Sequence, residues 1–277
     1  MAQDRITLKK FDVSSTGENM RDSDLDRVRN LRLFSSMSEP HFAELTSAGF
    51  MQKFPAGTTL LFEGDTVDFL YVLLDGVVEM QGSWNDKETT VSVIRPLSLF
   101  ILSSVVLDAP ALMSARTLER SEILMLSADK FRNALRADGA FSLAVAEELA
   151  GWNRAMVRQV KNMKLRSASE RLANYLLQLQ VQQGGVTTLR LLHEKRILAS
   201  LLGMTPENLS RAFAALSDYG VEVQGNEVRL TILGALRRMA KPSPYIDNHM
   251  PPLDHLGGKA ERELWPPNDK ASKVIFD

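Results

Sequence analysis

Residues 202–211 read Leu-Gly-Met-Thr-Pro-Glu-Asn-Leu-Ser-Arg, a stretch that joins a tight turn to the start of a helix. Gly203 can adopt the left-handed conformation of such a turn without steric cost. Thr205 is a good helix cap, and Pro206 suits the first helical position, where no amide donor is needed. The stretch therefore predicts a turn followed by a helix that begins at Pro206.

The predicted helix has two faces of opposite character. Glu207, Ser210 and Arg211 stand at i, i+3 and i+4 and so share one face. The other face is apolar and suited to burial: Leu209, Phe213 and Leu216. The polar side chains match the edges of base pairs, because arginine can donate two hydrogen bonds to guanine, glutamate can accept one from cytosine, and serine can contact thymine or adenine. We therefore expect this face to contact DNA.

The flanking sequence completes a winged helix-turn-helix, a motif whose second helix enters the major groove. Residues 195–202 have apolar side chains at helical spacing and end at Gly203. After the second helix come Gly220 and two short runs suited to strands, 221–224 and 228–230, around a turn at Gly225-Asn226. The alternative is a solvated helix face with an ordinary Glu-Arg pair four residues apart. The cap, the turn and the wing favour DNA binding.

The composition is that of a globular protein with two modest domains, with 277 residues of which 44% are hydrophobic and 24% charged. The net charge of −1 conceals an asymmetry. Residues 166–240 contain nine Lys and Arg against six Asp and Glu, or +3, whereas the rest of the chain carries 24 against 28, or −4. Because only the local field meets the phosphates, this mild excess is consistent with DNA binding.

Two absences narrow the function further. The chain has no cysteine, which excludes disulfides, thiol redox chemistry and cysteine-ligated iron-sulfur clusters. It also has no apolar run long enough to span a bilayer and no signal-peptide core, which predicts a cytoplasmic protein without membrane contact.

The residue pattern predicts an α+β protein of five segments. Residues 1–27 are expected to form a flexible arm. Residues 28–138 begin with helical spacing and continue with short β-prone runs between turn signals, which indicates a sensor domain built on an antiparallel β-barrel. Residues 139–166 form one long helix and residues 167–240 the winged helix-turn-helix domain. Residues 241–277 contain six prolines and are expected to be a mostly disordered tail.

The long helix carries an apolar stripe with the spacing of a coiled-coil seam: Leu149, Trp152, Met156, Val160 and Met163. We expect this helix to pair with its copy in a homodimer. Such a dimer would place two DNA-binding helices about one turn of DNA apart, so its operator would be palindromic. The alternative is that the stripe packs on its own barrel.

These features together resemble the Crp/Fnr superfamily of bacterial transcription regulators, which implies a cyclic-nucleotide-binding-like barrel followed by a dimerisation helix and a winged helix-turn-helix. The resemblance is carried by residues 54–58 and 70–78 of the predicted barrel, by the long helix and by the Glu-x-x-Ser-Arg motif, and it covers about residues 30–240.

The Fnr-like branch of this superfamily reads TTGAT half-sites of an inverted repeat with a Glu-x-x-Ser-Arg helix. The resemblance therefore implies that Glu207, Ser210 and Arg211 contact bases, and that Thr205 and Asn208 contact the DNA backbone. It also implies an activator that recruits RNA polymerase.

The predicted sensor domain departs from the members that bind cyclic nucleotides. In those proteins a Gly-Glu pair holds the ribose and an Arg-Ser pair holds the cyclic phosphate, because a buried phosphate needs a fixed cation and hydroxyl donors. Leu102-Ser103 and Met113-Ser114 stand at these positions here, so cyclic AMP is not expected to bind in the usual way. Arg116 shares a strand face with Ser114 and is a candidate replacement cation, with a structural ion pair as the alternative.

The same segment is the candidate effector pocket, represented by Phe100, Leu102, Met113, Ser114 and Arg116. It most resembles the NnrR and Dnr-like regulators, which control denitrification genes in response to nitric oxide. That resemblance makes haem a candidate cofactor.

A haem would need an axial ligand, and the chain contains four histidines. We name His41 and His193 as candidates, although neither lies in the β-rich segment. For each of them the simpler interpretation is an exposed or capping side chain.

Two other functions are compatible with parts of the sequence. A Crp/Fnr-type regulator without a ligand would be controlled by its abundance alone. A cupin-type barrel enzyme would need clustered histidine and carboxylate ligands for a metal, and the β-rich segment contains no such cluster. We therefore predict a regulator that is not an enzyme.

Overall fold

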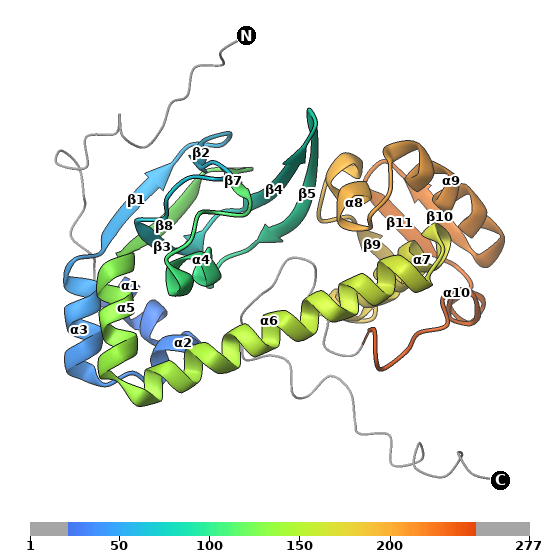
Figure 1. Cartoon of the computed structure of the whole chain (residues 1–277). Helices are drawn as coiled ribbons and strands as arrows, with labels where there is room; N and C mark the ends of the chain where they lie inside the picture. Colours follow the sequence, from blue (N-terminus) through green and yellow to red (C-terminus); the bar gives the residue numbers. More distant parts are fainter. Residues whose placement is uncertain (1–21, 248–277) are drawn as a thin grey trace, which may run out of the picture.

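The computed structural model describes residues 22–247, which form a barrel domain and a C-terminal domain connected by one long helix (Figure 1). The strands of the barrel domain are β1 (Phe50–Phe54), β2 (Thr59–Leu61), β3 (Phe69–Asp75), β4 (Val78–Trp84), β5 (Lys87–Ile94), β6 (Ser98–Phe100), β7 (Ser114–Thr117) and β8 (Ser121–Ser127). They form two antiparallel sheets with strand orders β1-β8-β3-β6 and β2-β7-β4-β5. The predicted antiparallel barrel is confirmed.

Alternation along the strands gives the barrel domain two cores. In β3, Leu70, Val72 and Leu74 belong to a core beneath the helices. Tyr71 and Leu73, which point to the opposite face, belong to a second core that fills the space between the two sheets. Because both faces of this strand are buried, its sequence is a continuous apolar run.

Short helices cover the outer face of the β1-β8-β3-β6 sheet (Figure 1): α1 (Asp22–Arg29), α2 (Arg32–Ser35), α3 (Glu39–Ser47), α4 (Leu102–Leu107) and α5 (Ala128–Ala137). The expected flexible arm, residues 1–27, is wrong for residues 22–27. These residues are helical because Leu25 and the adjacent Val28 pack into the helical core, and Arg27 donates a hydrogen bond to the carbonyl oxygen of Leu74. Residues 1–21 lie outside the described residues.

The long helix α6 (Gly139–Leu165) begins at an acidic cap. One carboxylate oxygen of Asp138 accepts a hydrogen bond from the Phe141 amide at 3.0 Å, and the other accepts one from the Ser38 amide at 2.8 Å. The buried side chains of Phe141 and Val145 then fix the first two turns on the helical core.

The apolar stripe of α6 serves two different surfaces. Leu149 and Trp152 are partly buried against the helical core of their own domain, as the alternative interpretation expects for these two residues. Met156, Val160 and Met163 lie beyond the edge of the barrel and are 55%, 40% and 42% exposed. The exposed part of the stripe is therefore the part that a second copy of the helix could cover.

The C-terminal domain comprises α7 (Ala168–Gln182), β9 (Thr188–Arg190), α8 (Lys195–Leu201), α9 (Pro206–Leu216), a short 3-10 turn, β10 (Val221–Gln224), β11 (Glu227–Leu230) and α10 (Leu233–Ala240). The strands form a small antiparallel sheet of order β10-β11-β9. The helices and the β10-β11 hairpin agree with the winged helix-turn-helix expected from the sequence, whereas β9 and α10 were not predicted. Within residues 22–247, no helix has the length and apolar character to cross a bilayer.

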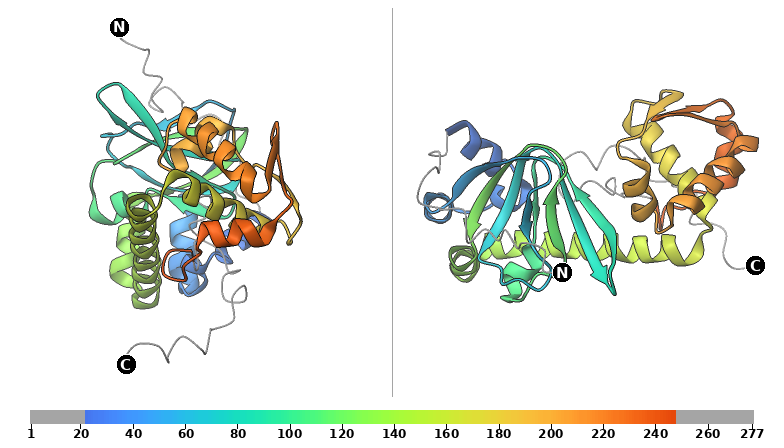
Figure 2. Two further views of the ribbon diagram at one scale, coloured as in Figure 1. Left: turned by 90° about the vertical axis from the view of Figure 1, so that its right-hand side faces the viewer. Right: turned by 90° about the horizontal axis from the view of Figure 1, so that it is seen from above.

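The two domains touch where α8 lies against the outer face of β5 (Figure 1), and Figure 2 shows the two domains from two further sides. Ile197 and Leu201 of α8 are buried against Val77 and Val93 of the barrel. Beside them, the guanidinium of Arg196 lies 3.9 Å from a carboxylate oxygen of Glu79, which is itself buried in the sheet.

The beginning of the tail is ordered, which corrects the expectation of disorder for residues 241–247. This segment runs from α10 back to α6, where Ile246 is buried and Asp247 forms an ion pair with Arg166. The sequence pattern missed this because the prolines exclude a long helix or a central strand but not a short turn held by side chains. Residues 248–277 of the predicted tail lie outside the described residues.

Candidate nucleic-acid interface

The predicted turn and helix start are present between α8 and α9. Gly203 has a φ of +63°, and its amide donates a hydrogen bond to the Ser200 carbonyl at 2.8 Å, which closes the turn after α8. Thr205 caps α9, since its hydroxyl oxygen accepts a hydrogen bond from the Asn208 amide at 3.3 Å. Pro206 occupies the first turn, as its fixed φ and missing donor favour.

α9 presents one polar face to solvent and buries the other. The exposed residues include all the predicted DNA contacts: Thr205, Glu207, Asn208, Ser210 and Arg211. The buried residues are those predicted for the core: Leu209, Phe213 and Leu216. Because α7 and α8 support the buried side, the polar face is open to a duplex.

The polar face has the charges needed for base contacts. The pKa of Glu207 lies below its usual range, mainly because the Thr205 hydroxyl donates to its carboxylate and to a smaller degree because of the nearby Arg211. Glu207 is therefore an ionised acceptor, as contact with a cytosine amino group requires. The Ser210 hydroxyl donates back to the Pro206 carbonyl at 3.1 Å, which leaves its oxygen lone pairs facing outward.

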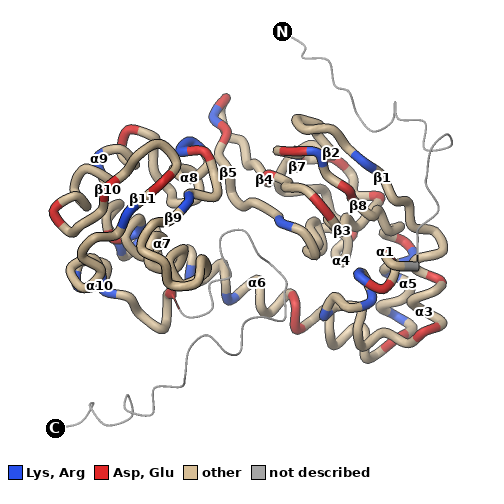
Figure 3. Tube along the Cα trace, turned by 180° about the vertical axis from the view of Figure 1, so that it is seen from behind, with Lys and Arg blue, Asp and Glu red and all other residues tan. Residues whose placement is uncertain are grey.

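Charges of both signs surround this face (Figure 3), with Lys and Arg interspersed with Asp and Glu around α8 and β11. The field that a single domain offers to phosphates is therefore modest. A pair of domains would double the number of phosphate contacts, and with it the electrostatic part of the binding free energy.

Arg171 of α7 joins three segments of the chain, a role that the sequence pattern did not reveal. Its guanidinium donates to the carbonyl oxygens of Met163 and Arg166 at the end of α6, at 3.2 and 2.8 Å, and to that of Gly203 before α9, at 3.3 Å. Burial lowers its pKa. One side chain thus joins the long helix to the turn that positions α9. No local signal announces this role, because only the folded chain brings the three carbonyls together.

The candidate effector residues do not line one common pocket. Phe100 is buried and stacks on Tyr71 with the ring centroids 5.1 Å apart, and Met113 packs beside this cluster in the barrel interior. Leu102 turns the other way, into the core beneath the helices, because the chain leaves β6 through a left-handed residue and enters α4 there. Burial raises the pKa of the Tyr71 hydroxyl, as an apolar interior would.

The polar members of that set point away from the barrel interior, because Ala115 between them is buried in the core between the two sheets. The Ser114 hydroxyl accepts a hydrogen bond from the Glu63 amide at 2.9 Å, and Arg116 is exposed on the same face of β7. The expectation that Phe100, Leu102, Met113, Ser114 and Arg116 form one site is therefore wrong. Leu102 lies in the other core, and Ser114 and Arg116 lie on the outer face of β7.

The candidate haem ligands do not fit a haem in the barrel. The Nδ1 atom of His41 lies 2.8 Å from the Ser38 hydroxyl and 3.3 Å from an Asp138 carboxylate oxygen, so this ring supports the start of α6. His193 is buried in the C-terminal domain, directly before α8. Neither ring faces the barrel interior, which large apolar side chains fill.

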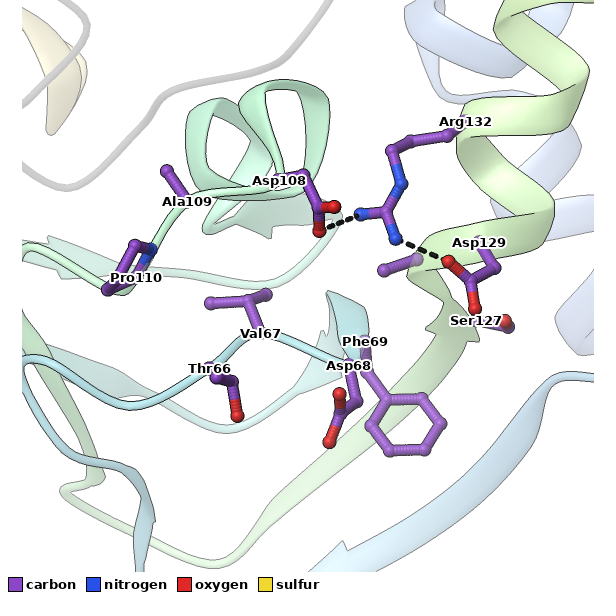
Figure 4. Close-up of a pocket in the computed structure, with 11 residues that line it drawn as sticks. Thr66, Val67, Asp68, Phe69, Asp108, Ala109, Pro110, Ser127, Asp129 and Arg132 are labelled. Carbon is purple, nitrogen blue, oxygen red and sulfur yellow. Dashed lines mark hydrogen bonds and ion pairs between the residues drawn. The ribbon is translucent and has the colours of Figure 1, made fainter.

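One cavity of about 430 Å³ opens between the start of β3, the end of α4 and the start of α5 (Figure 4). At the wall of this cavity the Arg132 guanidinium lies 3.1 Å from a carboxylate oxygen of Asp108 and also pairs with Asp129. Asp68 lies across the cavity from Arg132. The segment in which the sequence placed the effector contributes Asp108, Ala109 and Pro110 to this acidic cavity, but none of the five candidate effector residues lines it. Among the described residues, no group of His, Cys, Asp and Glu is arranged to hold a metal ion.

Two family models match the chain in the order that the fold presents. The cyclic nucleotide-binding domain matches residues 51–138, and the Crp-like helix-turn-helix domain matches residues 170–239. The chain belongs to the Crp/Fnr family. It is a DNA-binding transcription regulator, and the C-terminal domain with α9 is its DNA-binding domain.

Relatives and solved structures agree with this assignment. A CRP-like cAMP-activated global transcriptional regulator of Mycobacterium tuberculosis is 27% identical over 221 residues, which cover 76% of this chain and 96% of that protein. The fold is shared with a mutant of CooA from Carboxydothermus hydrogenoformans, with a TM-score of 0.62 and 20% identity over 80% of this chain and 98% of that one. It is also shared with FixK2 from Bradyrhizobium japonicum, with a TM-score of 0.60 and 18% identity over 71% of this chain and 99% of that one. The related proteins are regulators, so the prediction that this chain is not an enzyme is confirmed.

Proposed function

We propose that the protein is a homodimeric activator that binds TTGAT-like inverted repeats through α9. The observation that carries the proposal is the exposed face of Glu207, Ser210 and Arg211 on a helix with a capped, open amino terminus. Arg211 donates to guanine, Glu207 accepts from cytosine, and Ser210 contacts thymine or adenine. Thr205 and Asn208 lie at the helix amino terminus, where backbone amides and the helix dipole favour phosphate.

The homodimer is supported by the exposed part of α6. Met156, Val160 and Met163 form an apolar strip on a helix that extends past the barrel. A second copy of the strip would cover it, and the two-fold axis would set the two α9 helices at the two half-sites of a palindrome.

DNA binding is tested by titrating the protein against a TTGAT palindrome and a scrambled duplex at several salt concentrations. We expect specific binding to exceed nonspecific binding by roughly 10³ or more at physiological salt. Arg211→Ala should weaken specific binding by ~1–3 kcal/mol and relax the preference at its base pair. Arg136→Ala, at an exposed site on α5, is the matched control and should bind as the wild type does.

For the physiological role, we propose control of genes for nitrogen-oxide respiration, in response to nitric oxide or low oxygen and through recruitment of RNA polymerase. Support for this role comes from the resemblance of residues 100–118 to the Dnr-like regulators. Activation by cyclic AMP, which the M. tuberculosis relative's description names, is not proposed, since Leu102 is buried in the helical core and Arg116 lies on the outer face of β7.

The effector is tested by measuring operator affinity and promoter-dependent transcription with a nitric oxide donor, with cyclic AMP and with neither. Only an affinity that rises with nitric oxide supports the proposed role. An affinity that rises with cyclic AMP alone would assign the relative's effector to this chain, and a constant affinity would favour a regulator controlled by its abundance. The visible spectrum of protein from haem-supplied cells reports separately on haem.

A further inference from the structure

The junction between α6 and the DNA-binding domain is only two residues long. α6 ends at Leu165, α7 begins at Ala168, and the two residues between them have extended backbones, with φ and ψ of −120° and 141° at Arg166. Small changes in these few dihedral angles would swing the whole domain and α9 with it, as hinge residues do.

A segment beyond the wing crosses this junction. Residues 241–247, which we call the strap, leave the end of α10 and run back beside α6 (Figure 1). The model of the Crp-like helix-turn-helix domain ends at residue 239, so the strap lies outside the matched domain.

One end of the strap is fixed to the DNA-binding domain. The buried side-chain amide of Asn174 on α7 donates to the Ala240 carbonyl at 2.7 Å and to the Glu170 carbonyl at 2.8 Å. Lys241 then reverses the chain with a φ of +47°, and its ammonium lies 3.8 Å from a carboxylate oxygen of Glu170.

The other end is fixed to the junction itself. The Arg166 guanidinium donates to both carboxylate oxygens of Asp247, each at 2.6 Å, and the two side chains are only 7% and 13% exposed. Asp247 also accepts a hydrogen bond from the Ser243 amide at 2.6 Å, and Arg166 reaches Asn162 on α6 at 3.2 Å. A buried bidentate pair of this kind depends on geometry, because a displaced partner leaves an unpaired charge away from water.

Further contacts hold the strap on the side of α6 away from the exposed apolar strip. Ile246 is buried, and Lys161 lies 3.5 Å from the Tyr245 carbonyl oxygen and 5.9 Å from the centre of the Tyr245 ring. Lys161 follows Val160 by one residue, a step of about 100° around the helix, so the strap and a second copy of α6 can occupy the helix together.

We propose that the strap is a lock on the α6–α7 junction, which holds the DNA-binding domain in the orientation seen here through the Arg166–Asp247 pair. Releasing the pair frees the two junction residues and lets the domain swing about the end of α6. The remaining contacts are then those of Arg171 with the end of α6, the hydrogen bond from the Gln159 side chain to the Leu201 carbonyl at 3.1 Å, and the packing of α8 on the barrel.

The lock is tested by a distance measurement on the full chain, which contains no native cysteine to interfere with labelling. Spin labels are attached at Glu88→Cys in β5 and Asp218→Cys after α9, both exposed, and labelled chains are diluted with unlabelled chains so that the distance within one chain dominates. Asp247→Asn keeps the shape of the carboxylate and removes its charge. Asp75→Asn is the matched control, because it makes the same chemical change at an exposed carboxylate at the end of β3, away from the strap.

We expect one narrow distance distribution for the wild type and Asp75→Asn, and a broader or shifted one for Asp247→Asn. In Asp247→Asn, amide exchange at residues 165–168 should also be at least about tenfold faster than in the wild type, which corresponds to a loss of ~1.4 kcal/mol in the free energy of local opening. The exchanged pair Arg166→Asp with Asp247→Arg should restore part of the order. Equal widths and equal exchange in the wild type and Asp247→Asn would overturn the proposal.

Folding is checked by circular dichroism. If Asp247→Asn does not fold, Arg166→Lys, which keeps the charge but loses the bidentate geometry, takes its place with the same criteria. No readout involves DNA, so a negative result here leaves the proposed operator binding untouched.

Discussion

At Gly76, after β3, the backbone has a φ of +94°, and an added Cβ atom would lie 2.6 Å from the Arg120 carbonyl oxygen and still closer to the Ser121 hydroxyl. Gly64 has a similar φ of +86° but open space around it. Gly64→Ala should therefore lower the free energy of unfolding only by the strain of the left-handed backbone, ~1–2 kcal/mol. Gly76→Ala should lower it by a further ~1–3 kcal/mol, because the added methyl group overpacks its surroundings.

Denaturant unfolding of the two variants measures both costs in one domain. The difference between them isolates the steric clash from the backbone strain. Equal stability of Gly64→Ala and Gly76→Ala would show that the β8 end of the barrel yields to the extra methyl group.

At the residue scale, the sequence predicted side chains whose roles are local and missed those whose roles are not. Thr205, Pro206 and Gly203 act within a few residues of themselves, so their spacing announced the start of α9. Leu102 was misplaced because helix α4 interrupts the strands, and a short apolar run does not distinguish the two structures.

Among the elements, the start of α6 depends on Asp138, whose carboxylate accepts from two backbone amides and from the Ser38 and His41 side chains. These hydrogen bonds, most strongly that from Phe141, hold its pKa well below the usual range. A lowered pKa means that the stabilisation is complete above the unfolded value of ~3.9 and is lost as the pH falls from there towards the folded value.

Asp138→Asn should destabilise the barrel domain at pH 7 by ~1.5–3 kcal/mol, because hydrogen bonds to a charged acceptor are lost. The difference in unfolding free energy between Asp138→Asn and the wild type should narrow at pH 3, where the wild type has lost part of the same contribution. Denaturant unfolding at the two pH values checks this, with Asp86→Asn, at an exposed turn, as the control. A gap that stays constant or widens towards pH 3 would contradict the assigned role.

The exposed strip of α6 makes a prediction about assembly. Val160→Lys should raise the dimer dissociation constant at least about 100-fold, since each of the two copies loses a valine contact worth ~1.5 kcal/mol or more. Light scattering with size-exclusion chromatography measures it. Leu143→Lys, at another exposed apolar site on the same helix, is the control and should stay dimeric. A Val160→Lys chain that dimerises like the wild type would place the interface elsewhere.

The two surroundings of the apolar stripe on α6 were only partly foreseen from the sequence. Regular spacing along α6 identified an apolar stripe, but spacing does not say which partner covers each residue. The barrel ends near Trp152, so the same stripe meets the chain's own core on one side of that residue and solvent on the other. The β10-β11 hairpin was more predictable, because the turn between two neighbouring strands is encoded locally.

For the whole molecule, the domain order followed from the sequence, whereas the contacts that set the angle between the domains did not. Glu79 with Arg196 and Arg166 with Asp247 join residues far apart in the chain, and each residue alone resembles an ordinary surface charge. These contacts hold α9 at a defined place relative to α6. In a symmetric dimer that placement sets the separation of the two recognition helices.

The central claim is that Arg211 contacts a guanine from the exposed face of α9. It is tested most directly by binding wild-type protein and Arg211→Ala to a TTGAT palindrome with either guanine or 7-deazaguanine in the half-sites, since the analogue lacks the N7 acceptor. We expect the analogue to weaken the DNA-binding free energy of the wild type by ~1–3 kcal/mol and that of Arg211→Ala by almost nothing. An equal loss in both proteins, or no loss in the wild type, would contradict it.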